Sequence, residues 1–204
     1  MKYIKTFESH NNSTLIIVDV QKSFKKFFNE MYLNELNKYC KNFTDVYQIF
    51  DNHVDGKNVD KDYLYDVNPK IPNNGDLYSF PNQKLLVEKR YTYQVNCDFF
   101  KKILEEDVYT KIKDKENKNL LKRGELFKTK EGTAIVFIGN NHKWMHLGKK
   151  LLNLLESLNG KSVTIVGGAD GECLEDIYIS AVSLGVKIKR DWKYIYSATH
   201  CAIS

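Results

Sequence analysis

Residues 14–20 read Thr-Leu-Ile-Ile-Val-Asp-Val, an apolar run of strand length with a single acid, Asp19, near its end. Continuous apolar runs of this length are typical of parallel strands that are buried on both faces. Further strands are predicted at Asp45–Phe50, Lys84–Glu88, Thr133–Ile138, Ser162–Val166, Val186–Lys189 and Tyr194–Tyr196. Helical spacing of apolar residues predicts helices at Asn29–Phe43, Asp98–Glu106, Met145–Leu158 and Cys173–Leu184. This alternation of strands and helices predicts an α/β fold, in which a mainly parallel central sheet is flanked by helices on both faces.

The length and composition are those of one globular domain, which we assign to residues 1–204. Of the 204 residues, 42% are hydrophobic and 28% are charged, which suffices to bury one sizeable core. A charged segment at about 107–143 stands apart as an insertion. Because residues 107–132 have little apolar periodicity, we expect a protruding loop or hairpin there. The chain would then return to the central sheet at Thr133–Ile138.

The charge pattern and the cysteines indicate which kinds of partner and which cellular compartment to expect. The chain carries 31 basic and 26 acidic residues, a net charge of +5, with the lysines interspersed among acids. This pattern favours a solvated surface over a nucleic-acid interface. No apolar run reaches the roughly 20 residues of a membrane span, and residues 1–12 lack the apolar core of a secretory signal. Four scattered cysteines favour the reducing cytoplasm. A homo-oligomer stays open.

Residues with reactive or charged side chains follow several of the predicted strands, namely Asp19, Asp51, Lys89 and Cys173. Ligands of an open α/β sheet bind beyond the carboxyl ends of its strands. We therefore expect Asp19, Lys89 and Cys173 to converge at the ends of three adjacent strands. A thiol at a helix N-terminus gains thiolate character, and a nearby ammonium group strengthens the effect. Taken singly, a buried cysteine or an acid at a strand end also fits a purely structural role.

Three short motifs resemble those of the isochorismatase-like cysteine hydrolases, a family that includes nicotinamidases, isochorismatases and N-carbamoyl amidohydrolases. They are Asp19-Val-Gln-Lys-Ser-Phe24, the lysine of Val87-Glu-Lys89-Arg-Tyr91, and Val163-Thr-Ile-Val-Gly-Gly-Ala-Asp-Gly-Glu-Cys173. The helix that follows Cys173 also ends as the family's does, in Ala181-Val-Ser-Leu-Gly185. The resemblance covers roughly residues 14–100 and 145–198. It implies the three-layer α/β/α sandwich of that family.

The resemblance also implies a catalytic triad. Cys173 would attack a carbonyl carbon, Asp19 would serve as general base and then general acid, and Lys89 would hold both charges in place. The backbone N–H groups of Ala169 and Cys173 would form the oxyanion hole, preceded by a cis peptide bond between Gly168 and Ala169. Two departures from the family pattern stand beside this: Gly168 replaces an apolar residue, and a carboxylate, Glu172, precedes the nucleophile.

Asp51 and His53 resemble the start of the metal site of nicotinamidases, which bind zinc, iron or manganese. Those enzymes use a second histidine further along the chain, and none occurs here between His53 and Lys89. Two ligands are too few for a firm site. We name no certain cofactor and expect sub-stoichiometric metal. The alternative is that Asp51 and His53 form hydrogen bonds within a loop.

The motifs together favour a hydrolase that acts on a small amide or related C–N bond of a small-molecule substrate, nicotinamidase-like at the broadest. One alternative is an isochorismatase-type hydrolase of a vinyl ether, which does not need the thiol. The other is an inactive family member used for binding or structure. The first alternative predicts that activity survives Cys173→Ala, and the second predicts an unreactive Cys173. In the hydrolase, Cys173 would be the reactive thiol, ahead of Cys40, Cys97 and Cys201.

Overall fold

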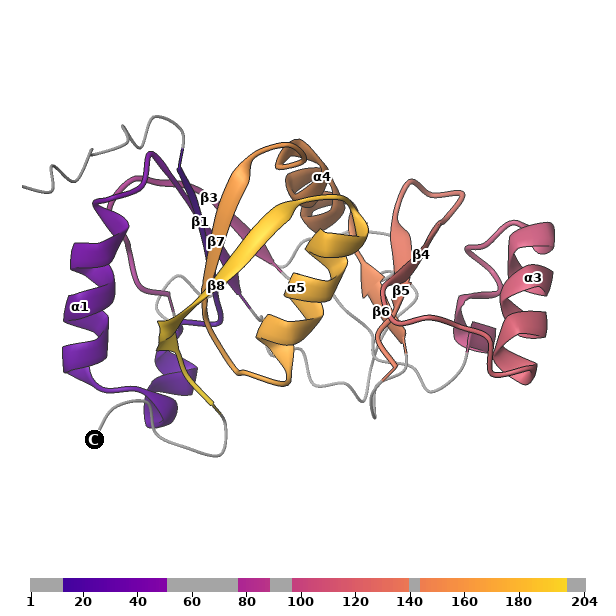
Figure 1. Cartoon of the computed structure of the whole chain (residues 1–204), viewed down its shortest axis with the longest axis horizontal. Helices are drawn as coiled ribbons and strands as arrows, with labels where there is room; N and C mark the ends of the chain where they lie inside the picture. The colour runs from indigo at the N-terminus through magenta and orange to yellow at the C-terminus, as the bar shows by residue number, and fades with distance from the viewer. Residues whose placement is uncertain (1–12, 51–76, 89–96, 140–143, 198–204) are drawn as a thin grey trace, which may run out of the picture.

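The computed structural model describes residues 13–50, 77–88, 97–139 and 144–197, and within these a parallel sheet forms the centre of the molecule (Figure 1). Its strands are β1 (Thr14–Val18), β2 (Asp45–Phe50), β3 (Gln83–Glu88), β7 (Ser162–Gly167) and β8 (Lys187–Ile195). They lie in the order β3-β2-β1-β7-β8, and every neighbouring pair is parallel. β8 is one continuous strand where the sequence predicted two short ones.

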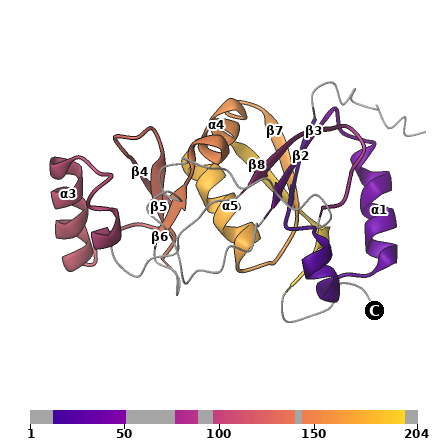
Figure 2. The ribbon, with the colours of Figure 1, turned by 180° about the vertical axis from the view of Figure 1, so that it is seen from behind.

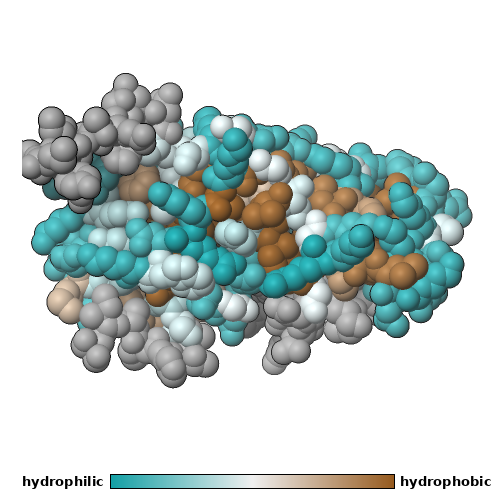
Figure 3. Space-filling model, in the orientation of Figure 1, coloured by the Kyte–Doolittle hydropathy of each residue, from teal (hydrophilic) through white to brown (hydrophobic). Residues whose placement is uncertain are grey.

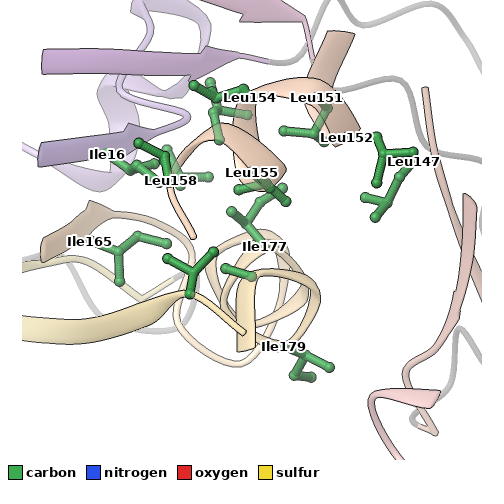
Figure 4. Packing of buried hydrophobic residues seen from close by; sticks show 14 of the residues in the cluster. Ile16, Leu147, Leu151, Leu152, Leu154, Leu155, Leu158, Ile165, Ile177 and Ile179 are labelled. Atoms are coloured by element: carbon green, nitrogen blue, oxygen red, sulfur yellow. The ribbon is translucent and has the colours of Figure 1, made fainter. Parts of the chain in front are cut away.

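Helices cover both faces of this sheet, so the predicted α/β class is confirmed (Figures 1 and 2). Side chains alternate along a strand: Leu15 and Ile17 of β1 face α1 (Glu30–Cys40), and Ile16 faces the opposite side. On that side lie α4 (Lys149–Ser157) and α5 (Cys173–Ser183). Leucines of α4 and isoleucines of α5 fill the space against the sheet (Figure 4).

A second, antiparallel sheet packs against the far side of α4 and α5. It consists of β4 (Glu125–Lys128), β5 (Ala134–Phe137) and β6 (Trp144–Leu147), in the order β4-β5-β6. The prediction that Thr133–Ile138 returns to the central sheet is therefore wrong. The error has a physical cause: β5 is covered on both faces, so its apolar run looks like that of a central parallel strand. Alternate residues of β5 point to the two sides, Val136 toward α4 and α5 and Ile135 away from them.

The charged insertion contributes strands to this small sheet and a helix that covers it, so the expected protrusion of residues 107–132 from the core is wrong. A 3₁₀-helix, η3 (Cys97–Phe100), and α3 (Glu106–Asn117) close a cluster that contains Ile112 and Trp144. The single helix predicted at Asp98–Glu106 is replaced by these two elements. α3 shows weak periodicity because Ile112 is its only fully buried residue. Along the molecule the layers run α1, central sheet, α4 and α5, small sheet, then η3 and α3 (Figures 1 and 2).

The helix predicted at Met145–Leu158 divides into a strand and a helix. β6 ends at Leu147, Gly148 follows as the N-cap in an extended conformation, and α4 begins at Lys149. Leu147 and Leu151 lie four residues apart and both belong to the same buried cluster. That spacing extends the helical pattern of α4 backward into the strand, which explains the error.

The visible face in Figure 3 carries apolar residues in its middle, around α5, and hydrophilic residues over most of the rest. Val182 of α5 and Trp192 of β8 are among the large apolar residues that are exposed. Among the described residues, no helix has both the length and the apolar character that a bilayer crossing requires. The sequence analysis left open whether the protein forms a homo-oligomer, and this possibility stays a prediction.

A core substitution in the insertion tests whether this outer layer belongs to the folded unit. Ile112→Ala should lower the free energy of unfolding by about 2–4 kcal/mol, because the side chain is fully buried. Leu120→Ala is the control, since Leu120 is 57% exposed, and it should change stability by at most about 0.5 kcal/mol. Urea denaturation measures both. Equal, small effects would mean that the insertion packs against nothing.

Candidate active site

Asp19 follows the last residue of β1 and is almost completely buried, with 1% of its surface exposed. Its N–H donates to the carbonyl oxygen of Ile49 in β2 over 2.9 Å, so the backbone is still held to the sheet here. Its φ is +52°, in the left-handed region where Asp and Asn are enriched among non-glycine residues. This conformation turns the chain sharply at the carboxyl edge of the sheet, with a carboxyl group at the turning point.

The end of β7 lies directly beside Asp19. Val18 pairs with Gly167 in the parallel ladder, and the N–H of Gly168 donates to the carbonyl oxygen of Val18 over 3.0 Å. A Cβ at Gly167 would overlap the backbone of Val18, so only glycine permits this approach. The turn from β7 to α5 therefore starts next to the candidate general base.

Cys173 is the first residue of α5 and is partly exposed. The turn before it is closed by Ala169, whose carbonyl oxygen accepts from the N–H groups of Glu172 (3.2 Å) and Leu174 (3.3 Å). The peptide bond between Gly168 and Ala169 is cis, which confirms that expectation. Glu172 is exposed, so water screens its charge. A partly exposed thiol at a helix N-terminus is the placement in which cysteines become nucleophilic.

Tyr196 is a site residue that the sequence analysis missed. It lies just past β8, is 2% exposed, and its hydroxyl donates to the carbonyl oxygen of Asp19 over 2.7 Å. Its ring fills the space in which a side chain at position 168 would stand. A ring from a distant part of the chain therefore occupies the space beside position 168, where glycine leaves room for it. No local pattern signals the role, because 177 residues separate Tyr196 from Asp19.

Asp176 is a second buried acid that the sequence analysis passed over. It is 5% exposed and follows Cys173 by three residues in α5, so the two lie on one side of the helix. The sequence held a weak signal: the acid stands three residues before Ile179, at the spacing of residues that share one face of a helix.

Three of the predicted site residues, Lys89, Asp51 and His53, lie outside the described residues. β3, which ends one residue before Lys89, is separated from β1 by β2, so the strands in question are not three adjacent ones. That part of the expectation is wrong. Two strand spacings amount to about 9–10 Å. Among the residues that the structure describes, no group of three or more His, Cys, Asp or Glu side chains is arranged to hold a metal ion.

The other described cysteines differ sharply from Cys173. Burial raises the pKa of the Cys40 thiol to about 12. Burial, followed by the charge of Glu116, raises the pKa of the Cys97 thiol to about 12 as well. The Cys97 thiol, which is fully buried at the start of η3, donates to Glu116 over 3.4 Å. Cys201 lies outside the described residues.

The chain matches no protein-family model, and neither the curated proteins nor the solved structures give a match. The likeness to the isochorismatase-like hydrolases therefore rests on the three motifs quoted above. The case for a function rests on the geometry and chemistry of the edge formed by β1, β7 and α5.

The thiols provide a direct test of this geometry. Limited iodoacetamide at neutral pH should label Cys173 first, while Cys40 and Cys97 stay protonated and unreactive in the folded protein. Peptide mapping by mass spectrometry gives the order, and labelling in denaturant controls for peptide recovery. If Cys40 or Cys97 were modified before Cys173, the buried environments described here would be wrong.

The contact between Gly168 and Tyr196 gives a second test. Gly168→Ala places a methyl group against the ring of Tyr196, so the ring has to move. We expect a loss of about 1–3 kcal/mol in unfolding free energy, the usual cost of overpacking. Thermal unfolding followed by circular dichroism measures it. An alanine tolerated without any loss would mean that the ring does not occupy this space.

Proposed function

We propose that the protein is a cysteine hydrolase that cleaves a small carboxamide or a related C–N bond. The Cys173 sulfur attacks the carbonyl carbon as Asp19 takes the thiol proton. The C–N bond of the tetrahedral intermediate then breaks, and Asp19 returns the proton to the departing amine. Water, deprotonated by Asp19, attacks the carbonyl carbon of the thioester that remains. The C–S bond then breaks, the acid is released, and Asp19 returns the proton to the Cys173 sulfur. The steps consume one water and yield one acid and one amine.

One observation carries the proposal: the β1–β7 pairing joins a buried carboxyl group to the turn that ends at a partly exposed cysteine. Val18 is in register with Gly167, Asp19 follows Val18, and the turn after Gly167 leads to Cys173. A buried acid and a helix-terminal thiol at one strand edge have the chemistry of a base and a nucleophile. The alternative is that Cys173 has a purely structural role as a small buried residue. Its partial exposure disfavours this.

We assign to Lys89 the role of neutralising the repulsion between the Asp19 carboxylate and the Cys173 thiolate. A thiolate at Cys173 and a carboxylate at Asp19 would repel each other, and a buried pair of like charges raises the proton affinity of both. An ammonium group between them removes this penalty and favours the ion pair. Lys89 follows β3 in the sequence, and the lysine and aspartate side chains together can span the two strand spacings between β3 and β1. Glu172 does not disturb the balance, because its side chain is exposed.

The turn suggests where the developing oxyanion would be stabilised. The carbonyl oxygen of Ala169 accepts two hydrogen bonds from residues of the first turn of α5, which fixes the peptide groups around it. We assign the N–H groups of Ala169 and Cys173 as the two donors. Fixed backbone donors at a helix N-terminus are the usual means of stabilising such charge.

The proposal is tested with a panel of small carboxamides and N-carbamoyl compounds, by measuring ammonia release. At least one compound should be turned over, and Cys173→Ala and Asp19→Asn should each lower the rate by about a hundredfold or more. Lys89→Met should also slow labelling of Cys173 by iodoacetamide. Cys40→Ser is the matched control, because Cys40 ends α1 just before β2 begins, at the amino edge of the parallel sheet and opposite the candidate site.

Two results would contradict the proposal. Turnover that survives Cys173→Ala would favour a reaction that does not need the thiol, such as vinyl ether hydrolysis. A Cys173 that reacts with iodoacetamide no faster than glutathione, together with no turnover of any compound, would favour an inactive protein used for binding.

A further inference from the structure

Tyr196 contacts both Asp19 and the turn that leads to Cys173, although it lies outside all three motifs. Its hydroxyl donates to the carbonyl oxygen of Asp19 over 2.7 Å. Its N–H donates to the carbonyl oxygen of Gly167, and its own carbonyl oxygen accepts from the N–H of Asp170, both over 2.9 Å. One residue therefore holds the end of β1 together with the start and the middle of the turn that precedes Cys173.

The ring of Tyr196 is fixed as firmly as its backbone. It stacks on Phe27, with ring centroids 6.2 Å apart and planes inclined by 8°. Phe28 lies at 5.4 Å and Tyr32 at 6.3 Å, both in tilted or edge-on contact. The fourth neighbour is the backbone of Gly168. Because the ring is enclosed in this way, its hydroxyl is held at one position, and the hydrogen bond fixes the position of the Asp19 carbonyl oxygen.

The acceptor of that bond, Asp19, has its backbone in the left-handed region, which few non-glycine residues adopt. Asp19 has a φ of +52°, and its carbonyl oxygen also accepts from the N–H of Gln21 over 3.0 Å. The two bonds fix the peptide group that follows Asp19, and with it the direction in which the chain leaves β1. Burial first, and then the charge of Asp19, raise the pKa of Tyr196 well above its ordinary value, so the hydroxyl keeps its proton.

We propose that Tyr196 is a positioning residue for Asp19, whose hydroxyl holds the Asp19 backbone in the conformation that directs the carboxyl group toward Cys173. The inference rests on the proposed function, because it takes Asp19 as the general base. It adds a residue that lies outside all three motifs. Tyr196 does not touch the reacting atoms itself, and its effect on Cys173 passes through Asp19.

Tyr32 provides a matched control. It is fully buried in the same aromatic cluster, and its hydroxyl donates to a backbone carbonyl oxygen, that of Tyr194, over 2.9 Å. Tyr32→Phe and Tyr196→Phe each remove one buried hydroxyl and keep the ring. The two variants should lose similar stability, as thermal unfolding would show, while only Tyr196→Phe alters the site.

The experiment measures the rate constant for alkylation of Cys173 by iodoacetamide across pH, in four single or double variants and the wild type. Tyr196→Phe should shift the pH profile of labelling to lower pH and speed labelling by up to about tenfold on the acidic side of the profile, because a displaced Asp19 carboxylate repels the Cys173 thiolate less. Tyr32→Phe should stay within about twofold of the wild type. Asp19→Asn should shift the pH profile of labelling to lower pH at least as far as Tyr196→Phe does, and the double variant Asp19→Asn/Tyr196→Phe should shift it no further than Asp19→Asn.

Amide hydrogen exchange gives a readout that does not depend on the thiol. The N–H of Gln21 should exchange faster in Tyr196→Phe than in Tyr32→Phe, because its acceptor, the Asp19 carbonyl oxygen, is then no longer held by the Tyr196 hydroxyl. The inference is overturned if Tyr196→Phe labels at the wild-type rate, or if its effect persists undiminished beside Asp19→Asn. Unchanged labelling in Asp19→Asn alone would instead overturn the proposed function, and the inference with it.

Discussion

Backbone hydrogen bonds between β1 and β7 bring Val18 into register with Gly167, and the candidate site follows from that pairing. A parallel ladder sends both strands out of the sheet at the same edge, so the residues after Val18 and Gly167 become neighbours without any contact of their own. Gly167 allows the backbones to approach closely, and Asp19 turns away with a positive φ. A shift of the ladder by one residue would separate the acid from the turn that leads to Cys173.

The helix that carries Cys173 also joins the two sheets. α5 packs on the central sheet through the cluster that contains Ile177, and the small antiparallel sheet packs on the same cluster from the other side (Figure 4). Glu175, two residues after Cys173, forms an ion pair with Arg190 of β8 and another, at 2.8 Å, with Arg123 of the insertion. Through Arg123 the insertion therefore contacts the first turn of α5, and it helps to hold in place the helix that carries Cys173.

The elements that a local pattern defines could be predicted from the sequence, and those that depend on distant partners could not. β1, β2, β7, α1 and α5 combine a strong apolar run or stripe with a clear end signal, and the ends of each were predicted within about three residues. β5 was assigned to the wrong sheet, because a strand covered on both faces has the same composition in either sheet. Asp19 and Cys173 stood out through their positions after apolar runs. Tyr196 did not, because its role depends on a contact made across almost the whole chain.

The central claim is that Asp19 and Cys173 face each other across the β1–β7 edge, with the charge of Lys89 between them. A crystal structure of the protein measures this directly, through the distances that join the Lys89 ammonium nitrogen to the Asp19 carboxyl oxygens and the Cys173 sulfur. We predict that both distances are within about 4 Å, the range of an ion pair. A Lys89 side chain on the opposite face of the sheet, or a Cys173 sulfur turned away from Asp19, would contradict the account.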